Sequence, residues 1–271
     1  MRNESQNFKI GLALGGGGAR GACHIGVLRA LLEADIRPNR ICGVSAGAIV
    51  GGLYAAGLDP DDMFEWIKES KLLSFIKIGI PKTGLTKLDY LKERIAAAWP
   101  ENTFEGLRLP LHVGITNLNT GQLELRANGP LHDVIAASCS IPFVFKPVWI
   151  DNQQYVDGGV VSNMPVDPLI HSTDFVIGSN LMPYANLAPT DVTTFVGVVW
   201  RCFDLSIMAN TVPSAALCDI VLEPTLLNDY HIFSLNRLRE LHDVGYEETR
   251  GRMAEIKNGI ALQRELMAEA G

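Results

Sequence analysis

The sequence predicts a three-layer α/β/α fold with a mainly parallel central sheet. Two short apolar runs, 9–14 and 40–44, each lead through a tight turn into a stretch with helical character. Successive strand-turn-helix units of this kind are typical of a parallel sheet with helices on both faces. Because 47% of the 271 residues are hydrophobic, the chain can bury a full core, and we expect one domain over residues 1–271.

The first unit begins with KIGLAL at 9–14, an apolar run that predicts a buried strand. Four glycines at 15–18 follow it and predict a turn, since glycine adopts backbone conformations that other residues avoid. Ile25, Leu28 and Leu32 then recur at helical spacing. The second unit runs from the strand at 40–44 through Ser45 into the small-residue helix AGAIVGGLYAAG.

The remaining elements are predicted from hydrophobic period and turn residues. An amphipathic helix is predicted over 86–98, and a hairpin over 111–126 that turns at Asn119, Thr120 and Gly121. A helix in 130–142, stopped by Pro142, is followed by short strands in 148–150 and 155–160 and by sheet strands in 174–180 and 219–224. C-terminal helices are predicted over about 230–268; they are charged, with leucines at helical spacing from 234, and are interrupted at Gly245 and Gly259. Asp157 therefore lies where a strand runs out into glycine.

The composition excludes several classes of protein. The chain has 30 acidic against 23 basic residues, a field that repels polyanions and argues against a nucleic-acid surface. The five cysteines lack C-x-x-C spacing, so we expect them to be reduced, buried and cytosolic: Cys23, Cys42, Cys139, Cys202 and Cys218. The polar first eight residues carry no apolar h-region, and no stretch reaches the ~18 uninterrupted apolar residues of a membrane span. We expect a protein that is neither exported by this route nor transmembrane.

The segment Gly43-Val44-Ser45-Ala46-Gly47 carries the first sign of chemistry. It fits G-x-S-x-G, in which a serine on a strained strand-to-helix turn exposes its hydroxyl and glycines avoid clashes. A strand is predicted directly before Ser45 and a helix directly after it, which aims a helix N-terminus at a developing oxyanion. Ser45 is therefore a candidate nucleophile, although a tight glycine turn with an idle serine has the same pattern.

The glycine block is a candidate oxyanion hole. Unsubstituted backbone at 15–18, followed by Ala19, Arg20 and Gly21, lets several N–H groups converge on one negative oxygen. Two nucleotide-binding interpretations compete. The P-loop lacks its Gly-Lys-Ser/Thr, and the dinucleotide fingerprint at Gly16, Gly18 and Gly21 lacks an acid at the end of the next strand.

Asp157-Gly158-Gly159 supplies a candidate base. A carboxylate with an ordinary pKa near ~3.9 is a poor base for serine, so Asp157 would depend on placement and partial desolvation. By itself, the same residue also suits a turn cap.

Together these motifs resemble the patatin-like phospholipase family, closely matching the order and spacing of bacterial members. The matching motifs, within about residues 8–225, are the glycine block at 15–21, GVSAG at 43–47, Ala137-Ser138-Cys139-Ser140-Ile141-Pro142, and Asp157-Gly158-Gly159. The resemblance implies the patatin-like architecture and a Ser–Asp dyad. Ser45 would form the acyl-enzyme and Asp157 would deprotonate first Ser45 and then water. Backbone N–H groups of Gly16, Gly17 and Gly18 would hold the oxyanion.

The resemblance also matches Arg20 to a basic position of the family, for which we consider orientation of the loop, contact with a lipid phosphate, or a surface arginine capping its turn. Because ordinary esterases place a histidine after the acid, His171, His231 and His242 are alternative bases. His24 is expected to pack or cap. No metal-ligand spacing is present, and neither calcium nor another cofactor is expected.

The expected activity is lipid acyl hydrolysis of the phospholipase A or lysophospholipase type, acting on phospholipids or other acyl esters. A general carboxylesterase or thioesterase with the same dyad, and a non-catalytic lipid-binding regulator, are the alternatives. The segment 68–92 contains six lysines but only two acidic residues, Glu69 and Asp89, among apolar residues. This composition suggests a lid that touches anionic lipid at the inner membrane surface. An ordinary solvated loop fits it as well.

Overall fold

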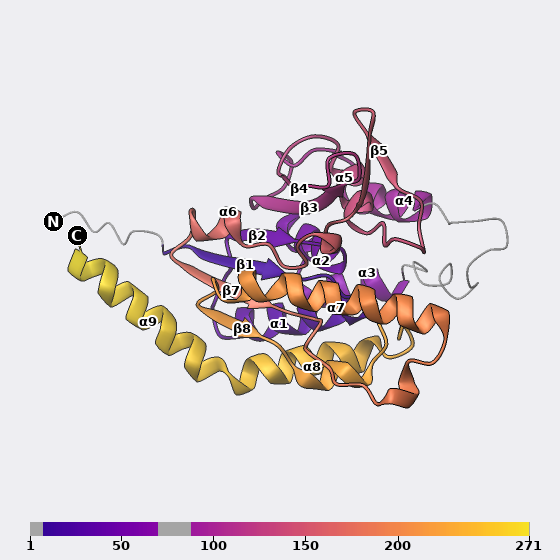
Figure 1. Ribbon diagram of the computed structural model, residues 1–271. Coiled ribbons are helices and arrows are strands. Elements are labelled where there is room, and N and C mark those ends of the chain that lie inside the picture. The colour runs from indigo at the N-terminus through magenta and orange to yellow at the C-terminus, as the bar shows by residue number, and fades with distance from the viewer. Residues whose placement is uncertain (1–7, 70–87, 271) are drawn as a thin grey trace.

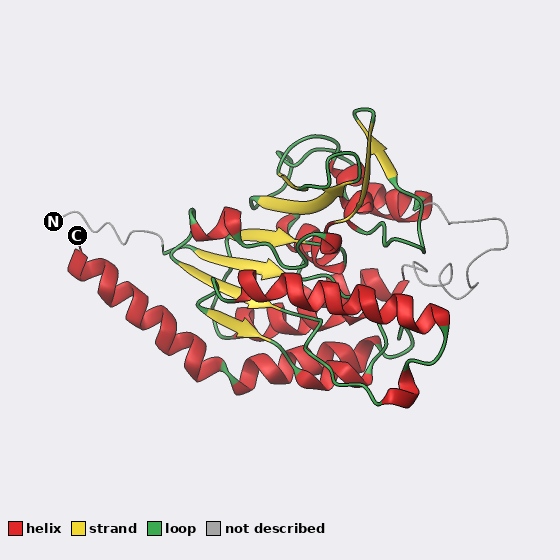
Figure 2. Ribbon diagram, viewed as in Figure 1, coloured by secondary structure: helices red, strands yellow, loops and turns green. Residues whose placement is uncertain are grey.

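Eight strands form one mixed sheet in the computed structural model, which describes residues 8–69 and 88–270 (Figures 1 and 2). The strands are β1 (Ile10–Leu14), β2 (Arg40–Gly43), β3 (Leu111–Asn117), β4 (Leu123–Arg126), β5 (Val148–Ile150), β6 (Gln153–Asp157), β7 (Phe175–Ser179) and β8 (Ile220–Leu222). Their order is β5-β6-β3-β2-β1-β7-β8, with β4 paired to β3. Strands β3, β2, β1, β7 and β8 run parallel, while β4, β5 and β6 pair antiparallel, so the predicted fold class is confirmed.

Helices cover both faces of this sheet. Their bounds are α1 (Ala22–Glu33), α2 (Ala46–Ala55), α3 (Pro60–Glu69), α4 (Asp89–Ala98), α5 (Leu131–Ser138), α6 (Asp167–Ile170), α7 (Phe195–Ala215), α8 (Leu238–Gly251) and α9 (Met253–Ala270). Along β1, Leu12 and Leu14 enter the large core with α1 and α2, whereas Ala13 enters a smaller core with α6. The alternation of side chains along a strand thus divides the interior into two layers.

The C-terminal helices differ from the prediction. Gly245 and Gly259 lie inside α8 and α9, and the break between these helices falls at Arg252. Both glycines serve close packing: a Cβ at Gly245 would lie 2.1 Å from the carbonyl oxygen of Cys23, and one at Gly259 would lie 3.0 Å from the Phe175 ring. These glycines were therefore wrongly interpreted as interruptions.

Helix α7, for which the sequence predicted no element, crosses in front of the sheet in Figure 1. Of its 21 residues only Ile207 and Thr211 are buried. By length and composition alone, this is the one helix among the described residues that is apolar enough to cross a membrane. Cys202, on α7, is exposed, so its predicted burial is wrong. The three cysteines at 23, 42 and 139 are buried, and all five are free.

The proposed lipid-contacting segment 68–92 falls largely on residues 70–87, which lie outside the described part of the chain. Its two described lysines are paired with carboxylates. Lys68 lies 2.9 Å from Glu65, and Lys92 lies 2.5 Å from Asp133. The hypothesis of a basic lid is therefore not tested by the described residues.

Candidate active site

Ser45 sits on a sharp turn between β2 and α2. Its φ of 54° and ψ of −121° place a non-glycine residue in a sparsely populated conformation, which is typical of strained functional positions. The side chain is at the N-terminus of α2, where backbone N–H groups of a helix favour negative charge. This local geometry is the strained strand-to-helix turn, or elbow, that the G-x-S-x-G motif predicts.

The glycines that flank Ser45 are there because backbone lies directly against them. A Cβ at Gly43 would lie 2.4 Å from the carbonyl oxygen of Gly47, and a Cβ at Gly47 would lie 2.1 Å from that of Leu14. Neither neighbour can move aside, because each belongs to the backbone of the elbow or of β1. The turn therefore excludes any side chain at these two positions.

Strand β3 brings the end of β2 to the end of β6. Val113 pairs with Gly43 of β2, and Ile115, two residues further on, pairs with Asp157 of β6. Because β4 pairs with Val113 and Ile115 on the opposite edge of β3, β2 and β6 must share one edge and meet end to end. This junction places Asp157 beside Ser45, although they are far apart in the sequence.

Asp157 is buried, and its carboxylate accepts a hydrogen bond from the Gly159 N–H at 2.9 Å. Loss of hydration on burial raises the pKa of Asp157 to about 6, while hydrogen bonds from Ser45 and Gly159 work in the opposite direction. The side chain does cap the turn at 158–160, so the turn-cap and base interpretations apply to one residue. A desolvated carboxylate bonded to a serine is an environment suited to a general base.

The motif at 137–142 bonds to the backbone of both Ser45 and Asp157, a role that its sequence does not predict. The Ser45 N–H donates to Ser138 Oγ at 2.8 Å, and Ser138 donates to the Gly114 carbonyl at 2.7 Å. The carbonyl oxygen of Ser140 accepts from the Asp157 N–H at 3.1 Å. The end of α5 and the residues directly after it thus fix the backbone of Ser45 and that of Asp157.

The glycine block lines the same pocket as Ser45. The Gly16 N–H is already occupied, since it donates to the Asn163 carbonyl at 3.1 Å. Within the described part of the chain, the N–H groups of Gly17 and Gly18 have no hydrogen-bond acceptor. Of the three predicted oxyanion donors, these two are therefore free to bind a ligand.

Asn163 is a pocket residue that sequence reasoning missed. Its side-chain amide donates to the Gly16 carbonyl at 3.3 Å, and its backbone N–H donates to Asn210 of α7 at 3.0 Å. Asn210 in turn donates to the Gly159 carbonyl at 2.8 Å. These bonds tie the glycine block, the Asp157 turn and α7 together.

Arg20 is buried, which rules out its interpretation as a surface arginine. Its guanidinium donates to the carbonyl of Tyr230 at 2.7 and 2.9 Å and to that of Leu181 at 2.9 Å. Desolvation lowers the pKa of Arg20, and the charge of Asp204 partly offsets this. Because its N–H groups point at protein carbonyls, the geometry supports the orientation of the glycine block by Arg20.

The histidines lie apart from the dyad. His24 is fully buried between Ser179 Oγ and the Gly15 carbonyl, each at 2.8 Å, and desolvation lowers its pKa to about 4. It therefore holds the glycine block in place as a neutral side chain. His171 and His231 are exposed, and His242 packs against Phe64. None of these four lines the pocket.

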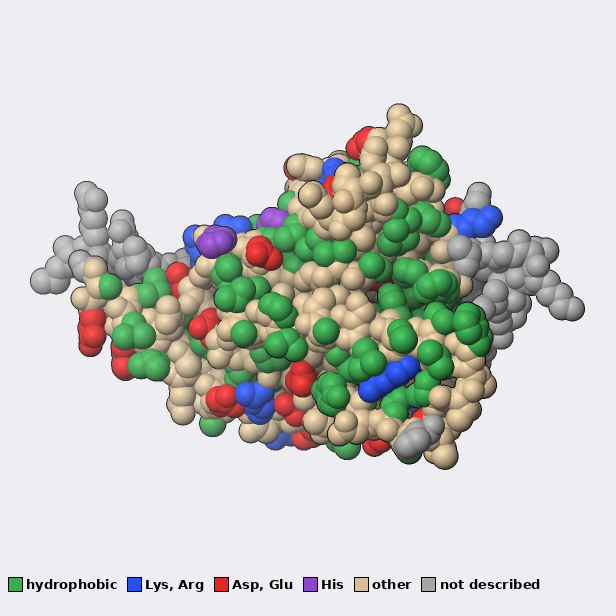
Figure 3. Space-filling model, in the orientation of Figure 1, with side chains coloured by type: hydrophobic (Ala, Val, Ile, Leu, Met, Phe, Trp, Pro, Cys, Tyr) green, Lys and Arg blue, Asp and Glu red, His purple; other side chains and the backbone are tan. Residues whose placement is uncertain are grey.

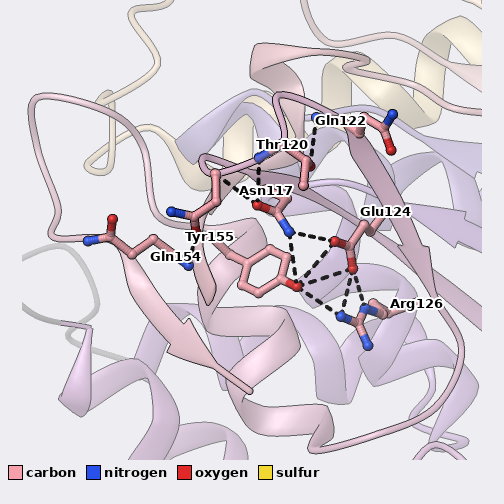
Figure 4. A network of polar contacts seen from close by, with 8 residues as sticks. Asn117, Thr120, Gln122, Glu124, Arg126, Gln154 and Tyr155 are labelled. Carbon is pink, nitrogen blue, oxygen red and sulfur yellow. Dashed lines mark hydrogen bonds and ion pairs between the residues drawn. The ribbon is translucent and has the colours of Figure 1, made fainter. Parts of the chain in front are cut away.

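The strands around Asp157 are held by a polar network (Figure 4). Tyr155, two residues before Asp157 on β6, donates its hydroxyl to Glu124 of β4 at 3.1 Å and accepts from Arg126 at 3.0 Å. The amide of Asn117 also donates to Glu124, at 2.8 Å. These contacts join β3, β4 and β6 and fix the strand that carries the candidate base.

The pocket itself is small, about 30 Å³ in volume. Its walls are the glycine block, the two candidate catalytic residues and α7: Gly16, Gly17, Gly18, Ser45, Ile141, Asp157, Asn163, Met182, Phe203, Asp204, Ile207 and Ile232. Among the described residues, no group of three or more His, Cys, Asp or Glu could hold a metal ion. The arrangement can accept a carbonyl carbon at Ser45 and a negative oxygen at the glycine N–H groups.

The model of the patatin-like phospholipase family matches residues 12–170. An uncharacterized NTE family protein of Mycobacterium tuberculosis is 33% identical over 168 residues, which cover 61% of this chain and 46% of that protein. Lysophospholipase NTE1 of Mycosarcoma maydis is 32% identical over 169 residues, covering 60% of this chain and 9% of that protein. The chain thus spans less than half of the length of these relatives.

Two solved structures resemble the chain at low identity. Human GIVD cytosolic phospholipase A2 has a TM-score of 0.48 and 10% identity, covering 94% of this chain and 60% of that one. VipD from Legionella pneumophila has a TM-score of 0.44 and 15% identity, covering 87% and 67%.

Proposed function

Because this chain belongs to the patatin-like phospholipase family, we propose that it is a lipid acyl hydrolase of the phospholipase A or lysophospholipase type. It cleaves carboxylic esters of phospholipids through an acyl-serine intermediate. The observation that carries this proposal is that Ser45 and buried Asp157 line the same pocket, which no described histidine lines.

The reaction follows from the positions of these groups. Asp157 accepts the Ser45 proton as the serine oxygen attacks the ester carbonyl, and the proton then passes to the departing alcohol oxygen. Asp157 then takes a proton from water as the water oxygen attacks the acyl carbonyl, and this proton passes to the Ser45 oxygen as the acid leaves. With a pKa of about 6, Asp157 is mostly ionised at pH 7 and is a stronger base than an exposed aspartate.

The oxyanion is assigned to the N–H groups of Gly17 and Gly18, since that of Gly16 is engaged by Asn163. Gly16 instead shapes the block: a Cβ there would lie 3.1 Å from that of Ser45 and 2.6 Å from the Asn163 side chain. Each oxyanion donor of this kind contributes on the order of 10²–10³ in kcat in hydrolases.

Contact with a lipid surface fits this substrate class. Several apolar side chains of α7 are exposed, including Phe195 at 84% and Val198 at 46%, and the same helix lines the catalytic pocket. Figure 3 shows hydrophobic side chains gathered on the face of the molecule that carries α7. Together with five unpaired cysteines, this supports a cytoplasmic enzyme that acts at a membrane surface.

The first test is hydrolysis of a short-chain p-nitrophenyl ester and of a phospholipid by the wild type and by variants. We expect Ser45→Ala and Asp157→Asn each to lower kcat by on the order of 10⁴-fold or more. His171→Ala, His231→Ala and His242→Ala are the matched controls and should retain turnover. Loss of activity in a histidine variant would indicate that this histidine is the base of a triad, in place of the proposed Ser45–Asp157 dyad.

The same assay separates the alternatives. A wild type that cleaves soluble esters or thioesters but no phospholipid would be a general carboxylesterase or thioesterase with this dyad. A wild type that is inactive on every substrate, yet binds vesicles, would be a lipid-binding regulator.

A further inference from the structure

A second cavity lies beside the catalytic pocket, between α7 and the segment that follows β7. Its volume is about 340 Å³, within the ~300–1,000 Å³ of ordinary ligand sites. The catalytic pocket, at about 30 Å³, has only the volume of roughly one water molecule. An ester carbonyl can reach Ser45 there, but a fatty acyl chain needs other space.

The two cavities are neighbours. Met182 lines both of them, and both have α7 as a wall, with Phe203 and Ile207 on one side and Met208 and Val212 on the other. The residues around the larger cavity, which we call the α7 groove, are Asn180, Met182, Tyr184, Leu205, Met208, Ala209, Thr211, Val212, Ala215 and Glu223.

Three polar members of the α7 groove, Asn180, Thr211 and Glu223, are already bonded, and the fourth, Tyr184, is exposed to solvent. Asn180 donates to Glu223 at 2.5 Å and accepts from the Met182 N–H at 3.0 Å. The hydroxyl of Thr211 donates to the Ile207 carbonyl within α7 at 2.8 Å. What the groove presents is therefore mainly hydrocarbon, which binds an apolar chain without leaving a polar group unpaired.

Met182 separates the groove from the catalytic pocket. It is only 5% exposed, and its sulfur accepts a hydrogen bond from Arg20 at 3.5 Å. An unbranched thioether side chain adapts its rotamer at small cost, so it can move aside for a chain passing between the cavities. Arg20 thus connects the glycine block to this partition.

We propose that the α7 groove binds the acyl chain of the substrate, with the scissile carbonyl at Ser45 and the chain passing over Met182. This assignment rests on the proposed function, and it makes α7 the element that sets acyl-chain preference. Each methylene that loses its contact should weaken binding about fourfold, from ~0.8 kcal/mol per buried methylene.

The test is the ratio of kcat/KM for p-nitrophenyl dodecanoate to that for p-nitrophenyl acetate. Ala209→Trp fills the groove from α7, and we expect it to lower this ratio at least tenfold. Met208→Ala removes apolar contacts from the groove wall and should lower the ratio by a smaller factor. Ser206→Trp is the matched control, because it adds the same indole to an exposed position of α7 that lines neither cavity.

Binding of dodecanoate to Ser45→Ala protein by calorimetry gives a second measurement that needs no turnover. We expect Ala209→Trp to weaken this binding, and Ser206→Trp to leave it as it is. Equal loss on both esters in Ala209→Trp, or the same ratio in all variants, would overturn the assignment while leaving the hydrolase intact. A wild type that hydrolyses neither ester would instead refute the proposed function.

Discussion

The two walls of the catalytic pocket are built in opposite ways. One wall, made of the glycine block, the elbow and the Asp157 turn, is mostly buried. Backbone oxygens lie 2.1–2.4 Å from the Cβ positions that glycine leaves empty at Gly18, Gly43, Gly47 and Gly158. The other wall, α7, fully buries only two of its 21 residues and is joined to the first by the hydrogen bonds of Asn210. Under the proposed function, the wall that carries Ser45 and Asp157 leaves little room for substitutions, whereas α7, the proposed wall for the acyl chain, leaves room for many.

The largest effect is expected from Gly47→Ala on the buried wall. Its Cβ would overlap the Leu14 carbonyl oxygen at 2.1 Å, which cannot yield without displacing β1 from the elbow. We expect the free energy of unfolding to fall by about 3 kcal/mol or more. Ester turnover should fall by more than ~10²-fold, because small misplacements of a nucleophile are costly.

The control for this substitution is Gly52→Ala, one turn further along α2. A Cβ there would meet only side-chain atoms, at 3.1 Å or more, and alanine favours the helix by about 1 kcal/mol. Urea unfolding of both variants provides the comparison. Similar stability of Gly47→Ala and Gly52→Ala would mean that the elbow is less rigid than its contacts indicate.

A smaller effect is expected from the charge of Asp157. Its pKa is raised from 3.8 to about 6, so the folded protein binds this proton more tightly than the unfolded chain. The resulting stabilisation is complete below pH 3.8 and is lost as the pH rises through 6. We therefore expect Asp157→Asn to match the wild type at the acid end and to be more stable by about 3 kcal/mol above pH 6.

Thermal unfolding across this pH range measures the difference. Asp151→Asn, an exposed carboxyl on the turn between β5 and β6, is the control and should show no such pH dependence. If Asp157→Asn were less stable than the wild type at pH 8, ionised Asp157 would not lower the free energy of unfolding as its raised pKa implies.

The smallest effect on stability is expected on α7. Phe195→Ser with Val198→Ser removes two exposed apolar side chains, so the free energy of unfolding should change by less than ~0.5 kcal/mol. Vesicle binding should weaken by roughly tenfold or more, because a phenyl group contributes about 1.5–3 kcal/mol when buried. Co-sedimentation with phosphatidylcholine vesicles measures it.

Leu262→Ser with Leu266→Ser is the corresponding control on α9. These leucines are 57% and 51% exposed, comparable to Val198, but they lie on a helix that does not line the pocket. Unchanged vesicle binding in the α7 variant, or equal loss in the α9 variant, would show that α7 is not the lipid-contacting surface.

The same contrast explains how much of the molecule was predictable. The strands before the glycine block and before Ser45 are continuous apolar runs, because both faces of a parallel strand are covered, and their ends are marked by glycine. Helix α7 has no amphipathic period to detect, since its exposed positions are apolar as well. Hydrophobic periodicity detects a helix only when an apolar face packs on the core and a polar face meets water. Helix α7 has no such division into an apolar and a polar face.

Within the site, the residues predicted from chemistry came together, and those that only support them were missed. Ser45 and Asp157 carry recognisable motifs, whereas Asn163 is an ordinary polar residue whose contacts depend on distant segments. The engagement of the Gly16 N–H by Asn163 is likewise a tertiary contact that local sequence does not encode.

The junction of β2 and β6 on one edge of β3 also bears on folding. The elbow forms from residues that are neighbours in the sequence. Asp157 joins it only after β6 has paired with β3, about 40 residues earlier in the chain. Non-local strand pairing is slow relative to local turns and helices. In a refolding experiment, the return of ester hydrolysis would therefore follow the formation of the β3–β6 ladder. The rate at which activity recovers would then report the rate at which the sheet is completed.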